Sequence, residues 1–204
     1  MGFFGGRGGG QTALPGRYTV KVKYEGEEAS QSFEVKPDPR FTIDQAVLKA
    51  NHDMAREAQK LTRTVQAAAQ RLQQTRQALQ TVGQHAREQR NPKMMEIMKQ
   101  MSEVEKKLKA LQETLSPTPP KQGMADRSSG LQSRVMRAVS GIAGAGIEPV
   151  SQAARVSYDK VKARLEAFLA GFNEFYEKDV AALSKRLQEA GFTLLPAVQP
   201  LKLN

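Results

Sequence analysis

The chain has 204 residues, of which 39% are hydrophobic and 6% aromatic, with no Trp and no Cys. This length and composition allow a packed core but exclude disulfides, thiol catalysis and the usual cysteine-based structural zinc sites. The formal net charge of +10 makes binding to nucleic acid or to an acidic surface physically feasible.

Residues 1–16 are predicted to form a glycine-rich linker. The run GGRGGG at positions 5–10 has almost no side chains to pack and has large backbone freedom. A nucleic-acid-binding Arg-Gly-Gly segment is disfavoured because the run holds a single Arg and no repeat. A dinucleotide-binding loop is excluded because no buried strand precedes the glycines.

Residues 17–40 are predicted to form a β-hairpin. Polar and apolar residues alternate along the first strand, which places on one face Tyr18, Val20, Val22 and Tyr24. The dipeptide at 25–26, Glu-Gly, supplies turn chemistry, and a second alternating strand follows up to Val35. Because an isolated hairpin is marginal in water, its apolar face must be covered either by the helices or by a larger sheet outside this chain.

Residues 41–115 are predicted to form a long helical hairpin. Thr42 and Gln45 have the spacing of a capping box at the start of its first helix, just after two prolines that block continuation of the strand. Apolar and small residues then recur at alternating spacings of four and three, which is typical of a coiled-coil seam. The members of this seam are Val47, Asn51, Met54, Ala58, Leu61, Val65, Ala68, Leu72, Thr75, Leu79, Val82 and Ala86.

The second helix of this hairpin is predicted to start at Asn91-Pro92, where a side-chain cap is followed by proline at the first helical position. A tight connection between two seams predicts antiparallel packing. The methionines at the start of the second seam are interpreted as adaptable core filling. The members of this seam are Met94, Ile97, Met101, Val104, Leu108, Leu111 and Leu115.

Residues 116–130 are rich in Pro and Ser and are predicted to form an exposed excursion, because the run SPTPPKQ that opens them cannot be helical. Residues 131–191 are predicted to complete the bundle with a short helix and a long C-terminal helix. A Gly/Ala turn at 141–146 follows the short helix. The apolar positions of the short helix are Leu131, Val135, Ala138 or Val139, and Ile142.

The C-terminal helix is predicted to open at Pro149 and to end at Gly191. The step from Tyr176 to Val180 shifts the heptad phase, which predicts local unwinding of the supercoil. Residues 192–204 form an apolar tail with two prolines, and we expect this tail to lie extended against a surface. The stripe of the helix is Tyr158, Val161, Leu165, Phe168, Phe172, Phe175 or Tyr176, Val180, Leu183 and Leu187.

Together these elements predict a mainly α fold, in which an antiparallel bundle of long amphipathic helices follows a β-hairpin. We expect the chain to act through coiled-coil-like helix packing, with the rest of its own protein or with another copy. The residues expected to form this helix-packing interface are Leu61, Val65, Leu72, Leu79, Ile97, Met101, Leu108, Leu165, Phe168 and Phe172.

The sequence offers little for catalysis. The two histidines, His52 and His85, lie far apart on one predicted helix, and neither has a second ligand at clear metal-binding spacing. No Walker sequence, HExxH or Gly-x-Ser-x-Gly motif is present. We therefore predict no catalytic, cofactor-binding or metal-binding residues, and the carboxylates are interpreted as solvating side chains.

A basic nucleic-acid- or ribosome-associated protein is the alternative from a different class. Cations are spread along the helical faces, which favours a solvated surface over a binding patch. In the alternative, phosphate would be contacted by Arg134, Arg137, Arg155, Lys160, Lys162 and Arg164.

Residues 13–40, ALPGRYTVKVKYEGEEASQSFEVKPDPR, resemble the segment that closes BNR-repeat and sortilin-like β-propeller proteins, often labelled glycosyl-hydrolase-like. The matching motifs are Leu14-Pro15-Gly16, Tyr18-Thr19-Val20 and Asp38-Pro39-Arg40, after a Gly-rich linker. At the turn, Glu25-Gly26 conservatively replaces the Asp-Gly dipeptide that is usual in the family. The final helix, with DVAAL at 179–183 and EAG at 189–191, is similar to the closing segment of the same family.

The resemblance implies that the propellers, with any catalytic residues, lie upstream of Met1, and that no functional residue of the family falls within this chain. The hairpin would then complete an immunoglobulin- or fibronectin-like sheet. The implied function is that of a C-terminal stabilising or assembly domain of an exported protein, with the upstream propellers or another chain as partner. The chain itself shows no signal peptide in its first residues and no apolar run long enough to span a membrane.

Overall fold

A computed structural model describes residues 13–42, 44–88, 92–117, 130–191 and 200–203, with the side chains of 85–88 and 92–94 left out. The chain is mainly helical and begins with a two-stranded antiparallel hairpin, as the sequence predicts. The elements are β1 (Gly16–Tyr24), β2 (Glu27–Val35), α1 (Gln45–Glu88), α2 (Pro92–Leu115), α3 (Leu131–Ala143), α4 (Gln152–Glu174), the π-helical turn η1 (Phe175–Val180) and α5 (Ala181–Glu189).

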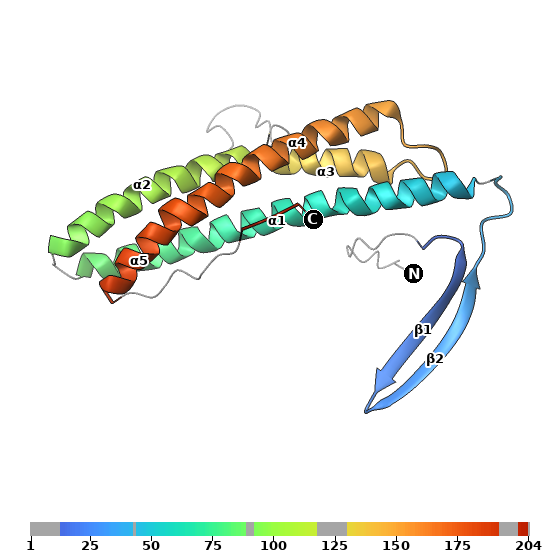
Figure 1. Cartoon of the computed structure of the whole chain (residues 1–204), viewed down its shortest axis with the longest axis horizontal. Coiled ribbons are helices and arrows are strands. Elements are labelled where there is room, and N and C mark those ends of the chain that lie inside the picture. The colour runs from blue at the N-terminus through green and yellow to red at the C-terminus, as the bar shows by residue number, and fades with distance from the viewer. Residues whose placement is uncertain (1–12, 43, 89–91, 118–129, 192–199, 204) are drawn as a thin grey trace, which may run out of the picture.

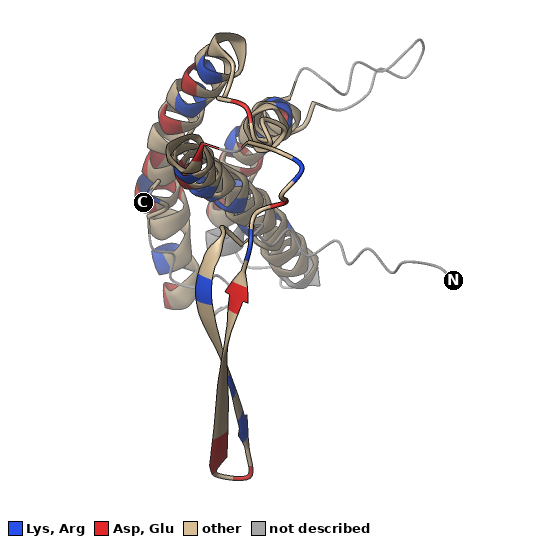
Figure 2. Cartoon of the chain, turned by 90° about the vertical axis from the view of Figure 1, so that its right-hand side faces the viewer, with Lys and Arg blue, Asp and Glu red and all other residues tan. Residues whose placement is uncertain are grey.

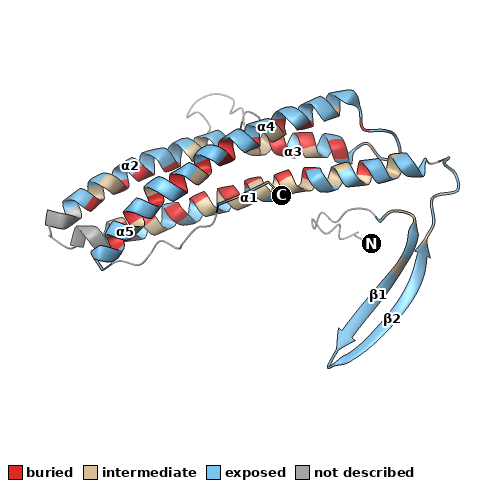
Figure 3. Cartoon of the chain, viewed as in Figure 1, coloured by how far each residue is buried: buried red, intermediate tan, exposed pale blue. Residues whose placement is uncertain are grey.

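The helices form one elongated bundle of three layers, and the third crosses the second obliquely in the view of Figure 1. The first layer is α1, and the second consists of α2 and α3, which follow one another back along α1. The third layer is the continuous run of α4, η1 and α5. Its chain runs in the same direction as that of α1, from the hairpin end of the bundle to the opposite end. The helix α1 packs against α2, α3 and α4, and α2 also packs against η1 and α5. One hydrophobic core runs between the layers (Figure 3).

The polar residues of the α1 seam have partners inside the bundle. Asn51 is buried, and its side-chain amide donates to the carbonyl of Gly146 at 3.1 Å and to that of Glu148 at 2.7 Å. These two carbonyls lie in the connection between α3 and α4. Buried polar groups are costly unless they are hydrogen-bonded. Asn51 therefore fixes the turn of the chain into the third layer.

Two helix starts differ from the sequence prediction. Helix α1 begins at Gln45, and the carboxylate of Asp44 accepts a hydrogen bond from the Ala46 amide at 2.8 Å, so Asp44 is the cap and Thr42 is not. Helix α4 begins three residues after Pro149, and the Ser151 hydroxyl accepts from the Ala154 amide at 3.2 Å. In both cases a short side chain closer to the helix accepts a hydrogen bond from one of the free amides of the first turn.

The predicted break in heptad phase lies at η1. A π-helical turn at Phe175–Val180 accommodates one extra residue, so that both Phe175 and Tyr176 are buried. The Tyr176 hydroxyl lies 2.8 Å from the Thr75 hydroxyl of α1, and the Arg71 guanidinium lies over the Tyr176 ring at 6.0 Å. Burial raises the pKa of Tyr176, while the hydrogen bond with Thr75 opposes that shift. The phase shift thus serves to aim a polar aromatic side chain at the α1 seam.

The C-terminal end of the chain is described in part. Gly191 follows the last turn of α5 with a φ of 86°, a left-handed conformation that favours glycine after a helix. Beyond it, Asn173 and Leu201 exchange two hydrogen bonds of 2.9 Å, from the Asn173 amide to the Leu201 carbonyl and from the Leu201 amide to the Asn173 side chain. Leu201 and Leu203 pack against the core. The predicted tail lies on the bundle surface here, and its residues 192–199 fall outside the described residues.

Helices α2 and α3 nearly meet end to end. A Cβ added to Gly130 would lie 2.6 Å from the Leu115 carbonyl oxygen and 2.6 Å from Pro117 Cδ. The predicted excursion therefore leaves and rejoins the bundle at one point, while its residues 118–129 lie outside the described residues. The short helix runs to Ala143, so Gly141 is helical and the predicted turn begins later, at Gly144.

We predict that Gly130→Ala destabilises the bundle by about 1–3 kcal/mol, because the new methyl group would lie only 2.6 Å from the Leu115 carbonyl oxygen and the backbone there would have to shift. Gly171→Ala is the matched control in α4. No atom lies within 4 Å of a Cβ there, so the higher helix propensity of Ala should stabilise the chain by about 0.5–1 kcal/mol. Urea unfolding followed by circular dichroism measures both effects. A neutral Gly130→Ala would contradict the contact between the ends of α2 and α3.

We predict that Thr75→Val destabilises the bundle by about 1–3 kcal/mol, because it leaves the buried Tyr176 hydroxyl without this partner. The double variant Thr75→Val/Tyr176→Phe should cost less than the sum of the two single variants, because both polar groups are then removed together. Thermal unfolding of the four proteins completes the double-mutant cycle. Strict additivity would show that the two hydroxyls do not interact.

Candidate interaction surfaces

The ten residues of the expected helix-packing interface are all buried within the chain itself. Their exposed fractions run from 0% at Val65 to 8% at Phe168. The set joins the three layers, with members on α1, on α2 and on α4. These side chains are covered by helices of the same chain, so a partner must use other residues.

Among the described residues, the hairpin exposes several large apolar side chains. Its apolar side chains are exposed at 51% for Val20, 58% for Val22, 71% for Tyr24 and 48% for Phe33. Nine large hydrophobic residues are exposed in the described part of the chain, and four of them lie on the hairpin. Exposed apolar clusters of this kind mark sites of interaction with other macromolecules. We call this surface, made of these four residues, the hairpin apolar face.

The hairpin points away from the bundle (Figures 1 and 3). Its strands pair in the register Tyr18 with Phe33 and Tyr24 with Glu27, around a two-residue turn in which Glu25 and Gly26 both have positive φ. This is the primed type of turn that matches the strand twist. The helices leave the hairpin apolar face uncovered, which excludes the first of the two predicted ways to bury it.

The root of the hairpin is held by local contacts. The Tyr18 hydroxyl donates to the Leu14 carbonyl at 2.7 Å, and the Tyr18 ring stacks on Phe33 with 6.0 Å between ring centroids. After the end of β2, Arg40 Nη2 lies 2.6 Å from Asp38 Oδ2. The hydrogen bonds from Arg40 keep the pKa of the Asp38 carboxyl below its usual range. These contacts order the strands and the connection to α1, and Leu14 and Pro15 just before β1 line a hollow together with Leu48 of α1 and Ile142 of α3.

The opposite face of the hairpin is polar and charged. Thr19 and Ser32 share a hydrogen bond of 2.9 Å between their hydroxyls. Lys21 and Lys23 both lie 3.0 Å from the Glu28 carboxylate. The hydrogen bonds from Lys23 and then Lys21 hold the pKa of Glu28 below its ordinary value. Two cations on β1 therefore share one anion on β2.

The six basic residues of the nucleic-acid alternative do not form one patch. On α4, Arg155 and Lys162 share one flank, and Lys160 and Arg164 share another, roughly 140–180° away around the helix axis. Glu166 follows Lys162 by one turn on the same flank. Figure 2 shows acidic and basic residues interspersed along the helices. The remaining two, Arg134 and Arg137, are exposed on α3.

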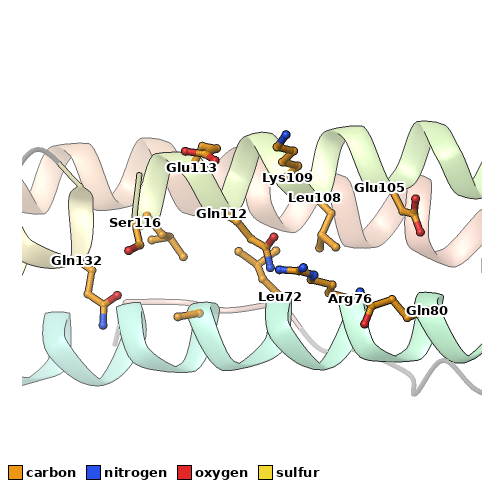
Figure 4. A pocket seen from close by; sticks show the side chains of 12 residues that line it. Leu72, Arg76, Gln80, Glu105, Leu108, Lys109, Gln112, Glu113, Ser116 and Gln132 are labelled. Atoms are coloured by element: carbon orange, nitrogen blue, oxygen red, sulfur yellow. The ribbon is translucent and has the colours of Figure 1, made fainter. Parts of the chain in front are cut away.

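A groove of about 890 Å³ with mixed polar and apolar walls lies between α1 and α2, and sequence reasoning missed it. Leu72 and Leu108 line it from the two helices, and Arg76 and Gln112 reach into the space between them (Figure 4). Its walls carry both signs of charge, with Glu105 among the acidic side chains. The seam pattern gives no signal for such a groove, because most of its lining positions, such as Arg76 and Gln112, flank the seam. The groove has no set of converging groups of one chemistry.

The two histidines remain apart in the structure. His52 is partly buried on α1, with its Nδ1 3.7 Å from the Asp53 carboxylate, and the side chain of His85 lies outside the described residues. Within the described ranges, no group of three or more potential ligands is placed to hold a metal ion. Of the helices that the structure describes, none combines the length and the hydropathy that a membrane span requires.

Comparisons with known proteins give no match. No protein-family profile matches the sequence, no curated protein is detectably similar to it, and no solved structure is detectably similar to its fold. The resemblance of residues 13–40 to the closing segment of BNR-repeat and sortilin-like proteins therefore stays a prediction from sequence motifs. The exposed hairpin is the strongest structural indication of function.

We predict that the bundle keeps its stability when residues 1–40 are removed, because the hairpin apolar face is not part of the core. The melting temperature should change by less than about 2 °C. Leu183→Ala is the control, since this core side chain is fully buried and its truncation should cost about 2–5 kcal/mol. Thermal unfolding by circular dichroism compares the two. A shift as large as that of Leu183→Ala would show that the hairpin belongs to the folding unit of the bundle.

Proposed function

We propose that this chain is a non-catalytic structural and interaction module, in which the hairpin attaches the helical bundle to a β-rich domain. The exposed hairpin apolar face carries this proposal. An isolated two-stranded hairpin is marginal in water and becomes stable when a further layer or further strands cover its apolar side. Because the bundle does not supply that cover, a domain outside the chain is the natural source.

The bundle buries its apolar side chains and the hairpin exposes its own, and this difference supports the proposal. The bundle buries its own apolar seams, including Leu72, Leu108 and Phe172, so its long helices already have their partners. The hairpin exposes Val22 and Tyr24 near its tip, at the end farthest from the bundle. A rigid bundle with an uncovered β element is suited to docking, with the hairpin as the contact and the bundle as the body that is held in place.

The resemblance of residues 13–40 suggests which domain is contacted. We propose that the chain is the C-terminal stabilising or assembly domain of a larger exported β-propeller protein, and that its hairpin completes an immunoglobulin- or fibronectin-like sheet. The partner is then the region encoded upstream of Met1, or a second chain that carries such a sheet. The motifs Leu14-Pro15-Gly16 and Asp38-Pro39-Arg40 flank the strands that would complete the sheet.

Hydrogen–deuterium exchange tests this proposal. The chain is joined to the region encoded immediately upstream of Met1, and exchange of the hairpin amides is compared with exchange in the 204-residue chain alone. We expect exchange in the joined protein to be at least about tenfold slower, because docking covers groups that are otherwise open to solvent. Val22→Thr/Tyr24→Thr should abolish the protection, since it removes apolar surface while keeping good strand formers.

Ser30→Thr/Ser32→Thr is the matched control, because it introduces two threonines on the polar face of the same hairpin. Protection should survive in this variant. Equal exchange in the joined and separate proteins would overturn docking through the hairpin. A promoter and ribosome-binding site directly before Met1 would overturn the placement of the chain at the C-terminus of a larger protein.

A further inference from the structure

Within the part of the chain that the structure describes, no further strand pairs with either edge of the hairpin, and the two edges differ in chemistry. The two-residue turn makes Tyr24 and Glu27 the first hydrogen-bonded pair, so the backbone groups of alternate residues point toward the partner strand. The groups that point outward from β1 are then those of Arg17, Thr19, Lys21 and Lys23. Open edges of this kind bind extended chains by strand addition.

The β1 edge is the better acceptor for an added strand. From 18 to 24 it reads Tyr-Thr-Val-Lys-Val-Lys-Tyr, in which every residue except the two lysines is a strong strand former. Strand β2 instead holds Glu, Ser, Gln and Ala at most positions, and these residues favour strands less. An added strand next to β1 would also extend the hairpin apolar face beside Val20 and Val22, which are the exposed aliphatic side chains of that strand.

The charges define what kind of strand fits. Lys21 and Lys23 lie on the polar face of β1 and share the single carboxylate of Glu28 on β2, so this part of the face has one cation in excess. Directly opposed side chains on neighbouring strands attract when their charges are opposite and repel when they are alike. Acidic residues on the added strand would face the two lysines from the open side.

We propose that the outer edge of β1 binds a strand of a partner β-sheet in which apolar residues, on the side of Val20 and Val22, alternate with acidic residues opposite Lys21 and Lys23. This inference rests on the proposed function and names the chemistry of the contacted strand. Main-chain hydrogen bonds supply the attachment, and the alternation fixes the register, because a slip of one residue would put acidic groups on the apolar side.

A second copy of this chain fits the edge less well. Symmetric pairing of β1 with β1 would place Lys21 and Lys23 opposite the cations of the other copy, which is repulsive. Pairing of β1 with the β2 edge of another copy would call on Glu28, whose carboxylate is already held by both lysines of its own hairpin. Such head-to-tail pairing is also heterologous, so it would build a ring or an open filament and not a closed dimer.

The test uses the full chain and two end-blocked nine-residue peptides. One peptide alternates Val with Glu, and the other has Lys in place of Glu. Peptide binding is followed by nuclear magnetic resonance at low salt, through amide shifts and slowed exchange at Thr19, Lys21 and Lys23. We expect the acidic peptide to bind about tenfold more tightly than the basic one, and to protect these outward amides. Equal binding of the two peptides would overturn the proposal without any variant being needed.

Proline substitutions then identify the edge. Lys21→Pro removes an outward amide of β1 while leaving the pairing with β2 intact, and it should abolish binding of the acidic peptide. Ser32→Pro makes the same change on the outer edge of β2 and should leave binding unchanged. The Tyr18–Phe33 ring contact reports whether each variant keeps its hairpin. Loss of binding in Ser32→Pro alone, with its hairpin intact, would assign the site to β2 and overturn the proposal.

Charge reversal is the second variant arm. Lys21→Glu/Lys23→Glu should reverse the preference, so that the basic peptide binds more tightly. Concentration-dependent self-association that Lys21→Pro abolishes would identify a second copy as the occupant and overturn the inference of an acidic partner strand. If the hairpin is protected in the joined protein but the peptides bind without charge preference, the proposed function stands and this inference fails. If the hairpin stays unprotected in the joined protein, the proposed function itself fails.

Discussion

The continuous apolar stripe of α1 is the constraint on which the rest of the bundle depends. A helix of 44 residues is about 66 Å long, and its seam is buried from Ala58 to Val82. Neither α2, at about 36 Å, nor α3, at about 20 Å, covers such a length alone. The two must follow one another along α1, and this explains why the chain between them leaves and rejoins the bundle beside Leu115. The third layer then packs along α1, α2 and α3 and buries the remaining apolar side chains of the first two layers.

The chemistry of the seams is complementary. The α1 seam is rich in small residues such as Ala58 and Ala68, and the third layer supplies large aromatic side chains such as Phe172 and Tyr176. Small residues on one helix allow close approach, and bulky residues on the facing one fill the remaining space. The π-helical turn lets two consecutive aromatic side chains enter the core. Its Tyr176 meets Thr75, which is why a polar residue is tolerated at the centre of the α1 seam.

Much of this architecture follows from sequence, because apolar residues at spacings of three and four form one stripe along a helix, and this stripe is buried when another helix packs along it. The seams and the phase shift after Tyr176 were predictable for that reason, and the hairpin was predictable from strand alternation on both sides of Glu25–Gly26. The cap at Asp44 was not, because several nearby side chains suit that role and tertiary packing decides among them. Exposure of Val22 was also unpredictable, since an alternating strand looks the same whether its cover lies inside or outside the chain. The basic residues of α4 look contiguous in sequence, but helical geometry separates them onto two flanks.

The independence of the hairpin from the core has a consequence for how the chain can work. Its order comes from cross-strand pairing, from the Tyr18–Leu14 hydrogen bond and from the Arg40–Asp38 ion pair at the exit of β2. None of these contacts involves the seams that stabilise the bundle. We therefore expect binding at the hairpin apolar face to leave the packing of the helices unchanged, because these side chains are not part of the core. In the function proposed above, affinity for a partner would depend on the hairpin sequence and rigidity on the helices, so that each could vary without loss of the other.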